Sequence, residues 1–224
     1  MWDVILRSCQ RLVAPFCDYP GVLARLIAAI LLTALVAGCD KASNAGIGGP
    51  GDKQDSASNA VVNLNGERID PFQSAKTNRT IVLVFLGVEC PISNRYVPEL
   101  RRLHNKFTGQ KVGWWFVYPG TSYSLQAIRQ HVREFNVPGD VASDPQLALA
   151  RRAQVRMTPE VAVFLADGKL MYHGRIDDRF PELTVERPAP TRRDLEETLD
   201  AILAGKSLAP VQTQAVGCFI PGLP

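Results

Sequence analysis

The strongest constraint on the fold is an uninterrupted run of apolar and β-branched residues, Thr80–Leu86 (TIVLVFL). A strand with one face in solvent alternates polar and apolar residues, whereas a run without alternation is typical of a strand buried on both faces. Such a strand needs covering layers on both sides of its sheet. We therefore expect Thr80–Leu86 to lie at the centre of a layered α/β domain.

The segments around this run predict further strands and helices. Apolar residues at three- and four-residue spacing predict a helix from just after Cys90 to about Phe107. The other predicted elements are an edge strand at Val61–Leu64, a buried strand at Val112–Val117, a helix from about Ser124 that includes Phe135, a short helix at Gln146–Ala153, a hairpin of Val161–Leu165 and Lys169–Ile176, and a last helix at Thr191–Leu203. In the last helix we expect Thr191 to be the N-cap and Leu195, Leu199 and Ile202 to face inward. Strand and helix alternate first and an antiparallel hairpin with a helix follows, an order that predicts a mixed central sheet flanked by helices.

The N-terminal region has the composition of a targeting segment followed by a linker. Leu26–Ala37 is apolar and uncharged but short for a bilayer span, and Arg25 precedes it. Small residues and Cys39 follow, so we expect residues 1–38 to be a secretory signal, with an uncleaved membrane anchor as the alternative. Residues 39–60 are rich in Gly, Ser, Ala, Asn and Asp and predict a flexible tether. Either alternative places the domain outside the cytoplasm, and an uncleaved anchor also attaches it to a membrane.

Charge and metal-ligand patterns exclude two classes of partner. The formal net charge is only +3, and no Lys/Arg run is interleaved with aromatic residues, so we expect no nucleic-acid surface. The five cysteines form neither a CxxC pair nor a zinc pattern, and we expect no metal and no cofactor. His104 and His131 are expected at solvated helix positions, whereas His173 either approaches the site or packs in the domain.

Three local features resemble thioredoxin-like proteins. Cys90–Ser93 (CPIS) lies between the buried strand and the helix, where that family carries its redox CxxC. Pro98 stands where the family's helix has a kinking proline. Thr158-Pro159 opens a strand, where the family keeps a cis-proline facing the reactive cysteine. The closer resemblance is to the bacterial redoxin group related to AhpC/TSA proteins, with segments similar to CPISNRYVPEL and RMTPEVAVF. It implies a thioredoxin-like domain over residues 61–206, followed by a tail, residues 207–224, that carries Cys218.

A second resemblance concerns the signal segment. Val36-Ala37-Gly38-Cys39 is similar to the lipobox of bacterial lipoproteins. In that family the chain is cut before the cysteine, which becomes lipid-modified. The resemblance implies a lipid anchor on Cys39.

The reactivity expected of Cys90 also follows from its position. A thiol at a helix N-terminus faces unpaired backbone N–H groups and the positive end of the helix dipole, which stabilise the thiolate and lower the pKa. Glu89 acts in the opposite direction, because an adjacent carboxylate disfavours a second negative charge. The alternative is an inert core thiol.

Several positions depart from the family patterns. Ser93 replaces the second cysteine of CxxC, and Val84 stands where thioredoxins have a buried aspartate. Peroxiredoxins have Thr or Ser where Gly87 stands. Asn94 occupies the position of the second cysteine of copper-carrying relatives, so a copper centre would be incomplete. These departures argue against dithiol exchange within the motif and against efficient peroxide reduction.

The leading hypothesis is a membrane-tethered thiol oxidoreductase. Cys90 would attack a protein disulfide, a small oxidised thiol or a peroxide. Pro91, Thr158 and Pro159 would shape the partner groove, and Ser93 would hydrogen-bond the sulfur. A peroxiredoxin-like peroxidase and a non-catalytic binding module remain the alternatives.

Cys218 is the candidate resolving thiol. Once the signal has left and Cys39 is acylated, Cys90 and Cys218 are the thiols that remain. Val216, Phe219 and Ile220 give the tail apolar residues with which to dock, so Cys218 either reaches Cys90 or stays a free thiol.

Overall fold

The computed structural model describes residues 61–223, apart from the side chains of residues 74–76. The predicted signal, the tether and Cys39 lie outside the described residues. In chain order the elements are η1 (Pro71–Lys76), β1 (Thr80–Phe85), α1 (Pro91–Phe107), β2 (Val112–Pro119), α2 (Leu125–Phe135), β3 (Asp140–Asp144), α3 (Ala148–Ala153), β4 (Met157–Thr158), β5 (Glu160–Leu165), β6 (Leu170–Gly174), α4 (Asp194–Leu203), β7 (Val211–Gln212) and β8 (Cys218–Phe219).

The main sheet is mixed and has β1 near its centre, as the sequence predicts. The strand order is β3-β2-β1-β5-β6-β7. β1 runs parallel to β2 and antiparallel to β5, with Thr80 opposite both Val112 and Leu165. Every residue of β1 is buried, which is why this segment carries no polar alternation.

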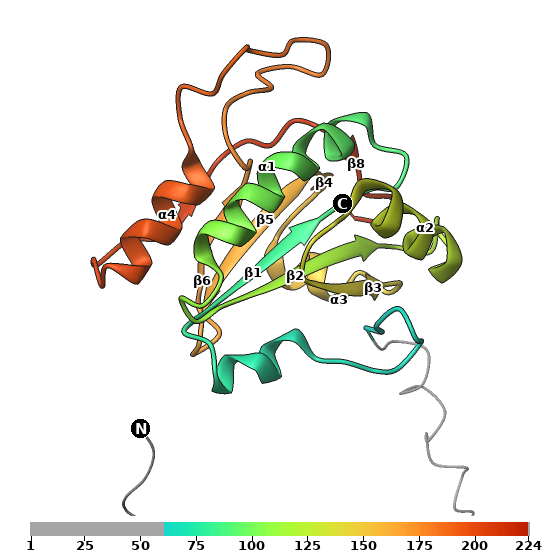
Figure 1. Ribbon diagram of the computed structural model, residues 1–224, viewed down its shortest axis with the longest axis horizontal. Coiled ribbons are helices and arrows are strands. Elements are labelled where there is room, and N and C mark those ends of the chain that lie inside the picture. The colour runs from blue at the N-terminus through green and yellow to red at the C-terminus, as the bar shows by residue number, and fades with distance from the viewer. Residues whose placement is uncertain (1–60, 224) are drawn as a thin grey trace, which may run out of the picture. The chain divides into compact units, whose positions relative to one another are not determined.

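Side chains of β1 alternate between two apolar clusters, one on each face of the sheet. Val82 and Val84 point into the cluster that contains the inward faces of α1, α2 and α4. Ile81 and Leu83 point into the opposite cluster, which contains α3 and is joined by Phe72 of η1. Figure 1 shows α1 lying across one face of the sheet. Burying each of these large side chains stabilises the fold by about 1.5–3 kcal/mol.

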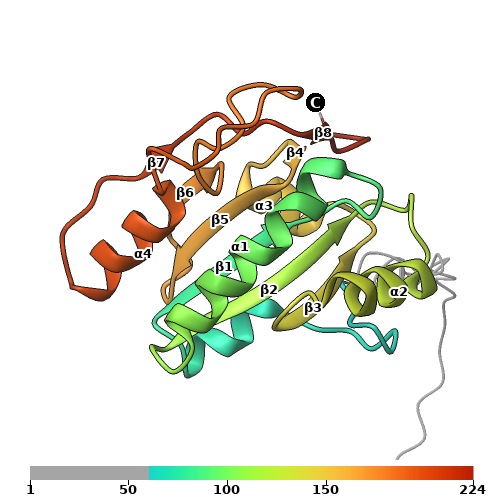
Figure 2. The same ribbon diagram turned by 45° about the horizontal axis from the view of Figure 1, so that its top comes forward.

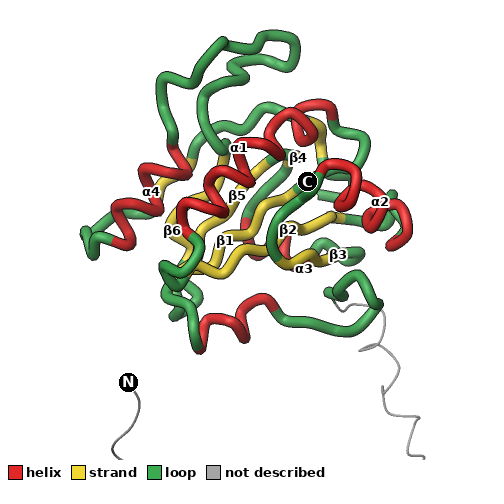
Figure 3. The backbone as a smooth tube through the Cα atoms, viewed as in Figure 1, coloured by secondary structure: helices red, strands yellow, loops and turns green. Residues whose placement is uncertain are grey.

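The C-terminal tail adds a strand to each of two sheets. β7 pairs in parallel with β6 at the edge of the main sheet. β8 pairs antiparallel with β4 in a separate two-stranded sheet, opposite Thr158. Figure 2 shows the tail passing beside β6 before it reaches β4. The long connection from β6 to α4, residues 175–193, is mostly loop (Figure 3). The tail is therefore part of the folded unit.

The structure differs from the sequence-based expectations at three places. β3 was not predicted, because its sequence DVASD contains little apolar surface; its last residue, Asp144, instead accepts the backbone N–H groups of Ala148 and Ala150. Thr191 is not the N-cap of the last helix, which begins at Asp194. The Thr191 hydroxyl donates to the Asp178 carboxylate, which holds it outside the helix. The strand predicted at Val61–Leu64 is reduced to isolated bridges of Val62.

The predictions for three side chains are also wrong. His131 is 2% exposed rather than solvated, because it packs between β2 and α1 and hydrogen-bonds to Tyr118 and Asn94. His104 is half-buried against Trp114. Phe219 does not dock the tail, since it is 76% exposed; Ile220 is buried in its place.

Candidate active site

Cys90 lies in the turn between the central strand and the first helix. The turn is closed by a hydrogen bond of 3.2 Å from the Cys90 N–H to the Gly87 carbonyl. Cys90 has extended backbone angles and is the N-cap of α1, and Pro91 begins the helix. Its side chain is only 2% exposed. The thiol thus faces the helix N-terminus, as the sequence predicts, but from a buried position.

Ser93 connects the first turn of α1 to this loop. Its hydroxyl oxygen accepts a hydrogen bond of 3.3 Å from the Gly87 N–H, and its side chain is fully buried. Gly87 has no room for a side chain, because a Cβ there would lie 2.9 Å from Thr158 Oγ1 and 3.1 Å from Cys90 Cβ. The Thr or Ser that peroxiredoxins place at this position therefore does not fit.

The strand that precedes Pro159 faces Cys90 from the other side. The peptide bond between Thr158 and Pro159 is cis, as predicted. The Cys90 thiol donates a hydrogen bond of 3.0 Å to the Thr158 carbonyl. Since a carbonyl can only accept, this contact favours the neutral thiol over the thiolate.

The tail places Cys218 at the same site. β8 pairs Cys218 with Thr158, and the Cys218 side chain is exposed. The two cysteines are free thiols and line one cavity of about 260 Å³. The other residues lining it are Leu86, Gly87, Glu89, Pro119, Ser122, Tyr123, Thr158, Phe219, Ile220 and Pro221. Of the three residues predicted to shape a partner groove, the cavity lining includes Thr158 but neither Pro91 nor Pro159.

Gly217 allows the tail to approach this closely. It is buried directly against β4, and a Cβ at this position would lie 2.0 Å from the Thr158 carbonyl oxygen. No other residue type avoids that overlap without a backbone shift. Gly217 therefore sets the distance between the tail and the Cys90 site.

The two thiols are perturbed in opposite directions. Burial acts to raise the pKa of Cys90, but hydrogen bonds from the Ser93 side chain, the Cys218 thiol, the Ser93 N–H and the Thr158 side chain outweigh it, so the pKa falls below the ordinary value. Burial, hydrogen bonding with Cys90 and repulsion from its thiolate raise the pKa of Cys218 to about 11. At neutral pH, Cys90 is the more readily ionised thiol and Cys218 stays protonated.

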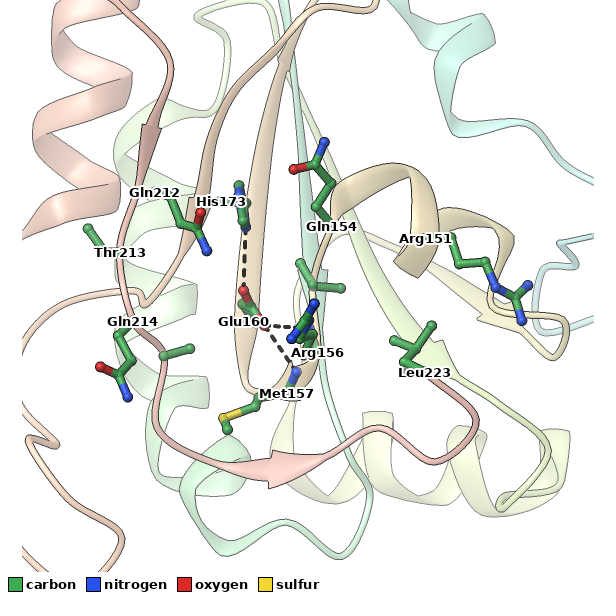
Figure 4. Close-up of a pocket in the computed structure, with 12 residues that line it drawn as sticks. Arg151, Gln154, Arg156, Met157, Glu160, His173, Gln212, Thr213, Gln214 and Leu223 are labelled. Carbon is green, nitrogen blue, oxygen red and sulfur yellow. Dashed lines mark hydrogen bonds and ion pairs between the residues drawn. The ribbon is translucent and has the colours of Figure 1, made fainter.

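A second cavity is lined by residues of β4, β5, β6 and the tail, and Figure 4 shows the Glu160 carboxylate between His173 and the backbone of Arg156 and Met157. It has a volume of about 640 Å³, and tail residues 212–215 form one wall. The buried Glu160 carboxylate accepts the N–H groups of Arg156 at 2.8 Å and Met157 at 3.0 Å. Its other oxygen lies 3.7 Å from His173 Nδ1, which is buried and has no hydrogen-bond partner among residues 61–223. Glu160 thus fixes the residues just before Thr158 and, through them, the carbonyl that faces Cys90.

Sequence reasoning missed Glu160 and the contacts of Asn94. Glu160 carried a recognisable signal, because it is a carboxylate directly after Pro159 at the start of a buried strand. In the sequence, Asn94 is notable only because it stands where copper-carrying relatives have a second cysteine. Its side chain instead hydrogen-bonds to Val88 and His131.

Residues 61–223 contain no group of three or more His, Cys, Asp or Glu side chains arranged to hold a metal ion. Within the same residues, no helix is both long and apolar enough to span a membrane.

Comparison with known proteins agrees with this geometry. Residues 78–170 match the family described as thioredoxin-like. A hypothetical protein from Sinorhizobium meliloti is 20% identical, with a TM-score of 0.61 over 72% of this chain and 88% of that chain. An uncharacterized conserved protein from Geobacillus kaustophilus is 23% identical, with a TM-score of 0.60 over 74% of this chain and 88% of that chain. The C-terminal domain of a candidate thiol-disulfide oxidoreductase from Bacteroides thetaiotaomicron is 15% identical, with a TM-score of 0.50 over 65% of this chain and 91% of that one.

The search of curated proteins gave no match. The family match over residues 78–170 and the likeness to the solved structures show a thioredoxin-like fold, as the sequence analysis predicted. Since the structural relatives are less than 25% identical, they support the fold and leave the chemistry to be argued from the site.

Proposed function

We propose that this domain is a thiol-disulfide oxidoreductase in which Cys90 is the attacking thiol and Cys218 the resolving thiol. The observation that carries the proposal is the pairing of Cys218 with Thr158, which brings the tail thiol into the cavity of Cys90. The opposite pKa shifts of the two thiols support this division of roles.

The first step is attack by the Cys90 thiolate on a disulfide of the partner. A bond forms between Cys90 Sγ and one partner sulfur, and the partner's S–S bond breaks. The leaving sulfur departs as a thiolate and takes a proton from solvent. Ser93 supports the attacking form, because its hydroxyl and N–H donate to the Cys90 sulfur. The product is a mixed disulfide in which Cys90 carries no charge.

The second step is attack by Cys218 on the Cys90 sulfur of the mixed disulfide. Repulsion from the Cys90 thiolate and hydrogen bonding with it help to hold the pKa of Cys218 near 11, and both disappear once Cys90 is in a disulfide. Cys218 therefore ionises more readily only after the first step. Its attack releases the second partner sulfur as a thiol and leaves a Cys90–Cys218 disulfide, so two electrons pass to the partner. A dithiol protein or small thiol then reduces the domain, and the same steps in reverse oxidise a dithiol partner.

The alternatives have less support from the site. A peroxidase would lack the hydroxyl that peroxiredoxins place three residues before the cysteine, because Gly87 leaves no space for one. A non-catalytic module would not require the lowered pKa of Cys90, nor a second thiol in the same cavity.

The proposal includes a location outside the cytoplasm, with attachment to a membrane through Cys39. Its support is the sequence of residues 1–38 and the lipobox-like VAGC. An oxidising compartment also suits a protein whose tail thiol closes a disulfide.

Trapping the mixed disulfide tests the function. The Cys218→Ser variant lacks the resolving thiol, so it should accumulate a partner bound to Cys90 that runs as a larger, reductant-sensitive species on a non-reducing gel. Cys90→Ser is the matched control and should trap nothing. If Cys218→Ser captures no partner in cells and the Cys90 thiol resists iodoacetamide until about pH 9, the domain is a binding module.

A further inference from the structure

Two polar side chains in the first turn of α1 hold the turn that precedes Cys90. Ser93 accepts from the Gly87 N–H, as described above. Asn94 Nδ2 donates a hydrogen bond of 3.3 Å to the Val88 carbonyl. Ser93 and Asn94 occupy the positions three and four after Cys90. The backbone that leads into the cysteine is thus tied to the helix through both an N–H and a carbonyl, and the second tie requires that Asn94 present its NH₂ group to Val88.

The orientation of Asn94 is fixed by a buried histidine. Asn94 Oδ1 lies 2.8 Å from His131 Nε2, and His131 Nδ1 lies 2.8 Å from the Tyr118 hydroxyl. An amide oxygen can only accept, so Nε2 must carry the proton. In a neutral imidazole the other nitrogen then accepts, and the Tyr118 hydroxyl donates to it. Each group therefore donates to the next one, from Tyr118 through His131 and Asn94 to the Val88 carbonyl. We call this series the hydrogen-bond chain.

Burial of Tyr118 and His131 preserves this direction of hydrogen-bond donation. Tyr118 is 1% exposed and His131 2% exposed, and the Phe135 ring stacks on the imidazole with the centroids 4.7 Å apart. Burial lowers the pKa of His131, and the carboxylate of Glu134 offsets this only in part. Burial also raises the pKa of Tyr118. His131 and Tyr118 are therefore both neutral at neutral pH. Each of their polar atoms has the hydrogen-bond partner that a buried group needs.

We propose that Tyr118, His131 and Asn94 are positioning residues that set the nucleophilicity of Cys90 by orienting the turn before it. None of the three carries out the chemistry, since they act through the Val88 carbonyl and the backbone that follows it. The hydrogen-bond chain joins β2, α2 and α1, so packing in the core of the domain determines how the turn before Cys90 orients the thiol. The inference rests on the proposed function in that it concerns the same thiol.

The pH profile of Cys90 alkylation tests this inference. Iodoacetamide labelling of the Cys90 peptide, followed by mass spectrometry in full-length Cys218→Ser protein, gives the thiol pKa as the midpoint of rate against pH, independently of how exposed the thiol is. Tyr118→Phe removes the first donor without adding charge. It should raise the midpoint by about 0.5–1 pH unit, a three- to tenfold loss of thiolate at neutral pH. His131→Ala should have at least that effect, and His131→Gln should restore much of the midpoint, because its amide can donate to Asn94.

Tyr96→Phe is the matched control. Tyr96 is buried on α1 and donates a hydrogen bond of 2.6 Å to Asp177. Neither residue belongs to the hydrogen-bond chain. The control should lower the melting temperature and leave the Cys90 midpoint in place. If Tyr118→Phe and His131→Ala also lower the melting temperature but leave the midpoint at the parent value, the hydrogen bonds among Tyr118, His131 and Asn94 serve stability alone and the inference is overturned. A parent protein that reduces no disulfide would refute the proposed function, yet the midpoint comparison would still decide this inference.

Discussion

The substitution Gly217→Ala should move the tail away from the Cys90 site without replacing either cysteine. The added Cβ would lie 2.0 Å from the Thr158 carbonyl oxygen and 2.7 Å from its carbon. A carbon and a carbonyl oxygen normally stay about 3.3 Å apart, so one of the two strands has to move by roughly 1 Å or more. Both clashing atoms belong to the backbone, and no side-chain rotation relieves the overlap. The β4–β8 pairing must therefore open.

The size of the effect follows from the bonds that hold β8. Beside the ladder between β4 and β8, the Ile220 N–H donates to the Arg156 carbonyl at 2.9 Å. Two or three such bonds contribute about 1–3 kcal/mol in total, which is the range that overpacking typically costs. Each 1.4 kcal/mol is a factor of ten, so the population with Cys218 beside Cys90 should fall about tenfold or more. The melting temperature should fall by only a few degrees, because the main sheet does not depend on β8.

The assay is the rate at which the reduced protein forms its internal disulfide. Glutathione disulfide starts the reaction, acid quenches it, and mass spectrometry counts the Cys90–Cys218 peptide. Gly217→Ala should form this peptide about tenfold more slowly than the parent. Gly205→Ala is the control: a Cβ there meets nothing within 4 Å, but its φ of +71° makes alanine strained, so it lowers stability without displacing β8. Parent-like disulfide formation in Gly217→Ala would refute the argument that the close approach of the tail positions Cys218.

Three further predictions concern separate parts of the chain. Ser93→Ala should raise the pKa of Cys90, because it removes a donor to the thiolate, and an unchanged midpoint of alkylation against pH would contradict this. Burial acts to raise the pKa of Asp178, but hydrogen bonds from Thr191 and neighbouring N–H groups hold it at about 2, so its contribution to stability is complete above about pH 4 and is lost as pH falls from 3.8 towards 2. Asp178→Asn should accordingly flatten the acid limb of a plot of melting temperature against pH, and an equally steep limb would count against it. Cys39→Ala should release the protein into the soluble extracytoplasmic fraction, and full retention in the membrane would indicate that the apolar segment is an uncleaved anchor.

The parts of the fold that depend on apolar pattern could be predicted from the sequence. Thr80–Leu86 and the hairpin of β5 and β6 are buried runs, and their position in the mixed sheet follows from that burial. β3 could not be predicted in this way, because Asp140, Ser143 and Asp144 have no strand-like pattern. Its strand is imposed by the neighbouring β2.

The site shows the same division between local and long-range information. The position of Cys90 at a helix N-terminus is local and could be predicted. The burial of His131 could not, since it depends on Tyr118 and Asn94, which lie far from it in sequence. Nor does helical spacing show that Thr191 binds Asp178 rather than capping α4. In the tail, apolar content indicated docking, but only the structure shows that Ile220 packs while Phe219 is exposed.

Thiol release in a single turnover tests the central claim most directly. The reduced protein, with a molar excess of glutathione disulfide, should release two glutathione thiols per molecule and end as the Cys90–Cys218 disulfide. Cys218→Ser should release one and retain glutathione on Cys90, because no second thiol reaches the mixed disulfide. One thiol released by both proteins, with glutathione left on Cys90 of each, would contradict the claim that Cys218 resolves Cys90.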